Sequence, residues 1–156
     1  MAPVMQQYTS VELATDSTNM RIMGLDIGDK TIGVAVSDAM LLTAQARPTI
    51  RRSNLHSDLA LLQKIVVEDE VHEIVVGQPL HMDGRPSPQS RKVEQFARKL
   101  QESTHLPVVF CDERLTSFAA EQHLEEMGLN WRQRRQQVDK MAAMIILQTY
   151  LDERQP

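Results

Sequence analysis

The chain has 156 residues, of which 42% are hydrophobic and 24% are charged, and its formal net charge is −4. This balance predicts a soluble, cytoplasmic, globular protein with a substantial core. The acidic charge excludes a protein that coats nucleic acid by its overall charge, so any such contact must come from a local patch. A single cysteine, Cys111, excludes an internal disulfide framework and a cysteine-based zinc site.

The domain organisation is expected to be simple. Residues 1–19 are mixed and polar, and they predict a flexible N-terminal extension, not a secretory signal. No window reaches the length of apolar sequence that a membrane span needs, so no membrane association is expected. Residues 20–152 then form one domain, and residues 153–156 form a short tail.

The first half of the folded part predicts a meander of three strands. Residues 20–26 and 32–37 are rich in apolar and β-branched side chains, and the short glycine-bearing turn between them predicts a hairpin. Residues 43–50 predict a third strand. Pro48 places this strand at the edge of the sheet, because proline cannot donate a ladder hydrogen bond.

The second half changes to helices that alternate with strands. Apolar residues at helical spacing from Leu55 to Val66 predict a helix capped by Ser53 or Ser57. The later elements are, in order, a strand at 73–77, a helix that begins at Ser87 and Pro88, a strand at 107–111, a helix that ends near Met127 with Gly128 as its stop, a basic loop at 131–135 and a last helix at 138–151. This order predicts an α/β fold with a mixed five-stranded sheet, antiparallel across the meander and parallel in the last two strands, flanked by helices.

Asp26 is unusual because it lies in the strand expected at the centre of this sheet. A carboxylate there is costly to bury unless something pairs with it. Judged alone, Asp26 could accept turn amides at the end of the strand, form an ion pair with Lys30 or face solvent.

Further acidic residues could converge with Asp26. Asp112 and Glu113 follow the fifth strand, and the carboxyl ends of parallel strands usually face a ligand cleft. Asp139 lies on the apolar face of the last helix, where small side chains such as Ala143 allow the helix to approach the sheet closely.

These acids have structural alternatives as well. Asp112 and Glu113 could be a solvated pair with Arg114 as counter-ion, and Asp139 could cap its helix. If the acids converge, a divalent cation would relieve their mutual repulsion. Oxygen ligands favour Mg²⁺ or Mn²⁺ over zinc. Two such ions about 3.5–4 Å apart would hold the attacking water and the leaving oxygen of a phosphodiester.

Four stretches of the sequence carry a resemblance to a known family. They are GLDIGDKTIGVAVSD (24–38), VVGQPLHMDGRPSPQS (75–90), DERLTSFAAEQHL (112–124) and VDKMAAMIILQTYL (138–151). Together they resemble the YqgF (RuvX) family of RNase H-like proteins, described as Holliday junction resolvases and as nucleases of pre-16S ribosomal RNA. The sequence departs from the family's usual pattern at Gln78 and Ser117.

The resemblance implies an RNase H-like fold and a set of catalytic residues. It assigns catalysis and the binding of Mg²⁺ or Mn²⁺ to Asp26, Glu113 and Asp139, with Asp112 as the alternative to Glu113. The product would carry a 5′-phosphate.

Basic residues near these acids are candidate contacts for nucleic acid. Lys30, Arg85 and Arg114 could each hold a phosphate, although solvated surface positions or ion pairs are ordinary alternatives. The basic loop joins one aromatic ring to three guanidinium groups, which suits unpaired nucleic acid. Its residues are Trp131, Arg132, Arg134 and Arg135, and the patch could extend to Arg47, Arg51 and Arg52.

We therefore expect a metal-dependent endonuclease. The resemblance favours processing of the 5′ end of pre-16S rRNA in ribosome biogenesis over Holliday junction resolution in DNA recombination and repair. The partners would be precursor ribosomal RNA or branched DNA and, in the first case, the ribosome, with either a monomer or a homodimer. A non-catalytic RNA-binding module is an alternative. Phosphoryl transfer from ATP is another, because DIGDKTIG also resembles the first phosphate loop of sugar kinases.

Overall fold

The computed structural model describes residues 20–112 and 125–154. The expected extension at 1–19 lies outside the described residues. Within the last helix, the side chains of residues 131 and 134–140 are also outside the description. No helix in the described ranges is long and apolar enough to cross a membrane.

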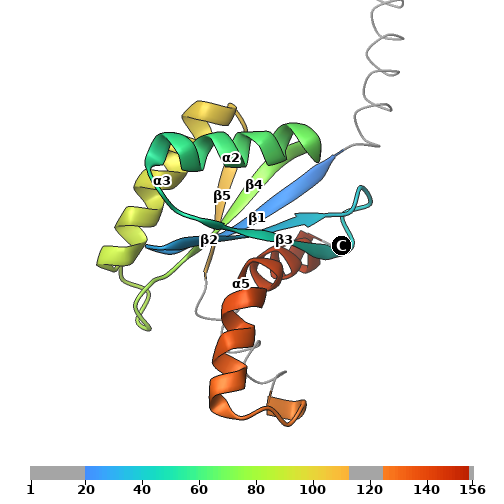
Figure 1. Ribbon diagram of the computed structural model, residues 1–156, viewed down its shortest axis with the longest axis vertical. Helices are drawn as coiled ribbons and strands as arrows, with labels where there is room; N and C mark the ends of the chain where they lie inside the picture. Colours follow the sequence, from blue (N-terminus) through green and yellow to red (C-terminus); the bar gives the residue numbers. More distant parts are fainter. Residues whose placement is uncertain (1–19, 113–124, 155–156) are drawn as a thin grey trace, which may run out of the picture.

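A mixed five-stranded sheet in the order β3-β2-β1-β4-β5 forms the centre of the fold (Figure 1). The strands are β1 (Arg21–Ile27), β2 (Thr31–Ser37), β3 (Ala44–Arg51), β4 (Val71–Gln78) and β5 (Val108–Asp112). The three-strand meander is antiparallel, whereas β4 runs parallel to both β1 and β5. The predicted meander and parallel strands are confirmed, and Pro48 lies in the edge strand β3 as expected.

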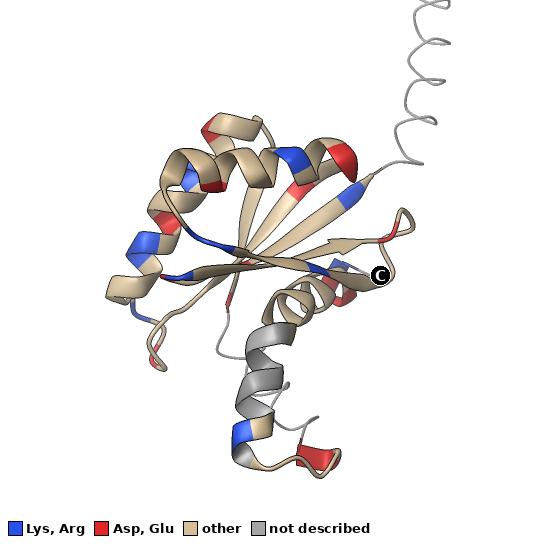
Figure 2. Ribbon diagram, in the orientation of Figure 1, with Lys and Arg blue, Asp and Glu red and all other residues tan. Residues whose placement is uncertain are grey.

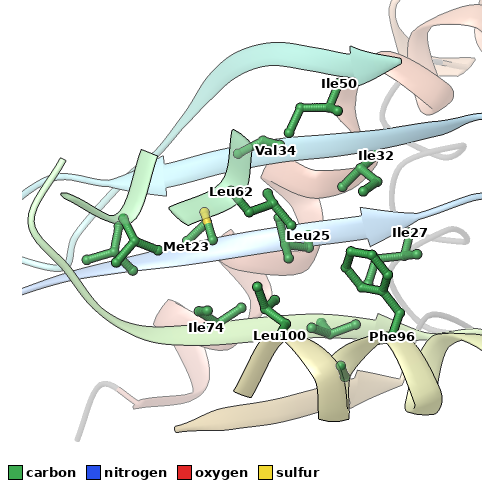
Figure 3. Packing of buried hydrophobic residues seen from close by; sticks show 14 of the residues in the cluster. Met23, Leu25, Ile27, Ile32, Val34, Ile50, Leu62, Ile74, Phe96 and Leu100 are labelled. Atoms are coloured by element: carbon green, nitrogen blue, oxygen red, sulfur yellow. The ribbon is translucent and has the colours of Figure 1, made fainter. Parts of the chain in front are cut away.

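One face of the sheet is covered by α2 (Leu55–Glu68) and α3 (Pro88–Thr104). Buried side chains from both helices, such as Leu62 and Leu100, pack against apolar strand residues such as Leu25 (Figure 3). This face holds the larger core of the protein, because alternate residues of β1, β2 and β4 point into it.

The starts of these two helices are fixed by side-chain caps. The Ser87 hydroxyl accepts a hydrogen bond from the Ser90 amide, and the Ser90 hydroxyl accepts one from the Ser87 amide. Pro88 follows at the first helical position, as predicted. The prediction of a serine cap for α2 is wrong. Asn54 caps this helix, because its extended backbone lets its side chain accept the Ser57 amide at 2.9 Å.

The opposite face of the sheet is covered by α5 (Trp131–Arg154). We expected a basic loop at 131–135 and a helix only from residue 138, and this expectation is wrong. The Asn130 side chain accepts the Gln133 amide at 2.9 Å, and the Gln133 side chain accepts the Asn130 amide at 3.0 Å. This reciprocal cap starts the helix early, and the arginines and glutamines that follow are good helix formers.

The C-terminal end of α5 is tied to β4. The Tyr150 hydroxyl donates to the Glu73 carboxylate, and the Arg154 guanidinium forms an ion pair with Glu73 at 3.0 Å. Arg154 also lies 5.6 Å from the centre of the Tyr150 ring. Burial, together with the bond to Glu73, raises the pKa of Tyr150 above its ordinary value. These contacts hold α5 against the sheet.

Gly24 allows α5 to approach β1 closely. A Cβ atom at this position would lie 2.7 Å from the Leu147 Cβ and 3.1 Å from the Ala143 carbonyl oxygen. Real Cβ atoms do not tolerate the first distance, so a side chain on Gly24 would force the helix away from the strand. The glycine two residues before Asp26 is therefore required by packing.

We predict that Gly24→Ala lowers the free energy of unfolding by about 1–3 kcal/mol, because the added methyl group overpacks the contact with α5. Urea denaturation of wild type and variant would measure the change. Gly33→Ala in β2 is the matched control, since its Cβ would meet the nearest atoms at the ordinary distances of 3.4 and 3.5 Å. Equal losses for the two variants would contradict this account of Gly24.

Candidate functional site

The carboxyl ends of the three parallel strands lie together at one edge of the sheet. Gly77 of β4 is in register with Cys111 of β5, and Gln78 is in register with Asp112. Asp26 is the penultimate residue of β1 and follows Leu25, which is in register with Val76 of β4. The predicted acidic positions on β1 and β5 therefore belong to the same edge.

Asp26 lies on the face of the sheet that α5 covers. Its neighbours Leu25 and Ile27 point into the core under α2 and α3, so strand alternation directs Asp26 to the other face. A Cβ atom on Gly33 would lie 3.5 Å from the Asp26 Cβ and 3.4 Å from the Ala143 Cβ. Asp26 is thus half-buried beside Ala143 of α5.

Asp139 precedes Ala143 by four residues in α5. This spacing puts the two residues on the same face of the helix, with Asp139 one turn nearer to the helix start. The backbone therefore puts the Asp139 position on the side of α5 that faces β1. The Asp139 side chain lies outside the description.

Asp112 belongs to the opposite face of the sheet from Asp26. Its register partner Gln78 donates from its amide to the Glu94 carboxylate of α3 at 2.7 Å, which identifies the α3 side. The preceding residue, Cys111, packs with α5 instead. Because successive side chains of a strand alternate between faces, the Asp112 position points away from Asp26.

Glu113 and Arg114 lie outside the described residues. Of the three acids predicted to converge, the structure therefore describes the side chain of Asp26 alone. In the described ranges, no group of three His, Cys, Asp or Glu side chains could hold a metal ion. Asp26 itself offers carboxylate oxygens at a half-buried strand end. This donor type suits Mg²⁺ or Mn²⁺.

The candidate contacts for nucleic acid are distributed around this edge. Lys30 is exposed in the β1–β2 turn, four residues after Asp26, and Arg132 is exposed in the first turn of α5. Arg85 is exposed in the loop after β4, where its guanidinium pairs with Asp83. The Arg85 amide and guanidinium hold the pKa of Asp83 below its usual range. The side chains of Trp131, Arg134 and Arg135 lie outside the description.

Two arginines considered as extensions of the basic patch have structural partners instead. Arg47 forms an ion pair with Asp69 at 2.9 Å. Arg52 donates from Nε to the buried carboxylate of Asp58 at 3.2 Å, and its guanidinium lies 5.0 Å from the centre of the Phe96 ring. Local sequence patterns do not indicate this arrangement, because Arg52 follows β3 whereas Asp58 belongs to α2 and Phe96 to α3.

The fold is also found in solved structures. The Thermus thermophilus RuvC structure determined in complex with a Holliday junction substrate has a TM-score of 0.56 and 14% sequence identity, covering 86% of this chain and 95% of that one. A second structure of the same RuvC has a TM-score of 0.55 and covers 96% of that chain. Together with the sheet order, these similarities show that the chain has the RNase H-like fold, as predicted.

The family follows from the sequence comparisons. The family model of RuvX, described as Holliday junction resolvase, matches residues 20–153. A Moorella thermoacetica protein named "Putative pre-16S rRNA nuclease" is 55% identical over 133 residues, which cover 85% of this chain and 95% of that protein. A Clostridioides difficile protein of the same name is 48% identical over 132 residues and is covered to 94%. The chain belongs to the RuvX (YqgF) family.

Proposed function

We propose that this protein is a metal-dependent nuclease that processes the 5′ end of pre-16S ribosomal RNA during ribosome biogenesis. The single structural observation that carries the proposal is Asp26, a half-buried carboxylate at the end of the central strand on the face covered by α5. The family and the names of relatives that match along almost their whole length support a nuclease. The choice of RNA follows the names of these relatives.

Asp26, Glu113 and Asp139 are the proposed catalytic residues and metal ligands. The spacing of Asp139 from Ala143 supports a carboxylate from α5 opposite Asp26. Strand alternation supports Glu113 over Asp112, because Asp112 faces α3 and the next residue of a continued strand would return to the α5 side. All three are oxygen donors, which favours Mg²⁺ or Mn²⁺.

Hydrolysis would depend on the metal ions that these acids bind. Two bound cations would supply an activated water and stabilise the charge on the leaving oxygen. The protein's own contribution would be to place Asp26 at a strand end and the Asp139 position on a packed helix, so that little reorganisation is needed during the reaction. Half-burial of Asp26 also limits the water that competes for its oxygens.

The basic residues at the same edge would hold the substrate. Lys30 lies in the turn that follows Asp26, and Arg85 lies in the loop after β4, so both belong to exposed loops at the edge that carries Asp26. Arg114 and the segment with Trp131, Arg132, Arg134 and Arg135 would contribute phosphate contacts and stacking near Asp139. Binding to a ribosomal particle would fit this substrate.

Two other activities are distinguished by substrate. The printed description of the family favours a Holliday junction resolvase as the second candidate, so a four-way DNA junction belongs in any assay. Phosphoryl transfer from ATP is less well supported, since the described residues form a single sheet with its helices and that chemistry needs a second lobe.

We predict that purified protein cleaves a precursor of small-subunit ribosomal RNA with Mg²⁺ or Mn²⁺ and is inactive in EDTA. Asp26→Asn should lower the cleavage rate by more than about 100-fold, because it removes a metal ligand. Loss of a residue that only hydrogen-bonds to a ligand costs up to roughly 100-fold. End-labelled RNA and four-way junctions would be compared in the same assay. Asp152→Asn, an exposed acid at the far end of α5, is the control and should retain activity.

Each other result of this assay has a definite meaning. Cleavage of the junction alone would replace RNA processing with junction resolution. Equal cleavage by wild type and Asp26→Asn, or no cleavage of either substrate, would contradict a catalytic role and leave a nucleic-acid-binding module.

We predict opposite outcomes for the two acids that follow Cys111. Glu113→Gln should weaken Mn²⁺ binding and cleavage strongly, because it removes a proposed ligand. Asp112→Asn should keep most of both, because the Asp112 position faces α3. Calorimetric titration with Mn²⁺, alongside the cleavage assay, measures the difference. Loss of Mn²⁺ binding in Asp112→Asn with retention in Glu113→Gln would contradict the assignment.

A further inference from the structure

A groove of about 650 Å³ lies on the side of the sheet away from the proposed metal ligands. The β1–β2 turn, the start of α2 and one side of α3 form its walls. The lining residues used here are Asp29, Arg52, Lys92, Phe96, Arg98 and Lys99. Figure 2 shows several lysines and arginines along α3, although the whole protein is acidic.

The floor of the groove is held by several contacts and is electrically balanced. The Arg52 guanidinium lies over the buried Phe96 ring and forms an ion pair with Asp58, which is only 1% exposed. Its Nη1 also donates to the Gly28 carbonyl oxygen at 2.7 Å. Because the charges of Arg52 and Asp58 cancel, the field that a ligand meets is set by the exposed groups above them.

Those exposed groups are predominantly positive. Lys92, Arg98 and Lys99 line the groove, and Asp29 is the exposed acid that faces them. Lys92 lies 3.5 Å from Asp29, but both side chains are about two-thirds exposed, so the pair is weak and a phosphate can displace it. Lys99 has a similar exposed contact with Glu102 at 3.9 Å. Arg98 forms no ion pair with any residue in the described ranges.

The spacing of these cations suits an extended polyanion. Lys92 and Lys99 are two helical turns apart on α3, which separates their Cα atoms by about 10 Å along the helix. Arg98 lies beside Lys99 and can bind a phosphate through two nitrogen atoms. Lys92 and Lys99 therefore form a row along one side of the helix, as the backbone of a nucleic-acid strand requires. Arg98 lies about 100° around the helix from Lys99 and lines the same groove at its margin.

The groove is physically connected to the proposed catalytic edge. Gly28, which accepts from Arg52, comes two residues after Asp26, and the Arg52 amide donates to the Lys30 carbonyl oxygen at 2.8 Å. The turn at residues 28–30 thus separates the acids on the α5 side from the groove on the α3 side. A strand that passes over this turn can contact both.

We propose that this groove binds the phosphodiester backbone of single-stranded RNA that extends beyond the cleaved bond, with Lys92, Arg98 and Lys99 as the contacts. The inference rests on the proposed nuclease function for the identity of its ligand. The groove contributes affinity for the flanking strand, and the acids across the turn act on the bond itself.

The test measures RNA binding and cleavage separately. Arg98→Gln combined with Lys99→Gln removes two positive charges from the groove. Lys64→Glu is the matched control, because it makes the same change in net charge on the exposed side of α2, outside the groove. Fluorescence anisotropy with a labelled single-stranded RNA, in EDTA so that no cleavage occurs, gives Kd across a salt series.

We predict that the double variant weakens RNA binding about tenfold at low salt and makes the slope of log Kd against log salt shallower by about 1.4, as expected for two lost phosphate contacts. Lys64→Glu should change neither quantity appreciably. In the cleavage assay the double variant should raise KM for a long precursor and leave kcat unchanged. Both variants should keep the wild-type midpoint of thermal unfolding, because the substituted side chains are exposed.

Wild-type affinity in the double variant, or equal weakening by Lys64→Glu, would overturn the proposal that the groove binds RNA. Absence of RNA binding by the wild type would overturn it as well. If the wild type binds RNA through the groove but does not cleave it, the proposed nuclease activity is refuted and the proposed RNA binding is not. The two failures are therefore distinguishable.

Discussion

The close contact between α5 and β1 is the constraint on which the site depends. Gly24 has no side chain, so Leu147 and the backbone at Ala143 pack directly onto the strand. That contact sets the position of α5 over the sheet and brings Ala143 beside Asp26. The Asp139 position is one turn earlier on the same face of the helix backbone, the face that packs on the strand that carries Asp26. A packing requirement thus sets where the proposed metal ligands of β1 and α5 lie relative to each other.

The sheet separates two surfaces of opposite character that meet at one edge. The α5 side carries the proposed acidic ligands, whereas the α3 side carries a positively charged groove. Arg52 links them structurally, because it reaches from the groove floor to the turn that follows Asp26. This arrangement would let a protein with a net charge of −4 bind a polyanion locally.

Local signals in the sequence were sufficient for most of the fold. The meander, the edge position of Pro48 and the start of α3 at Ser87 each depend on neighbouring residues, and they were predicted. The start of α5 was missed, because the reciprocal cap that Asn130 forms was hidden within a segment that resembled a basic loop. The opposite orientations of Asp26 and Asp112 require the register of the sheet, and the groove over Arg52 requires three elements to meet; neither is encoded locally.

The central claim is that the metal ligands gather on the α5 face of the sheet. Anomalous X-ray scattering from crystals soaked in Mn²⁺ would locate the ions directly. The account predicts ions bound between Asp26, Glu113 and Asp139, with the Asp112 carboxylate on the other side of the sheet. An ion held by Asp112 without Asp26, or no ion at Asp26 under conditions that support cleavage, would contradict it.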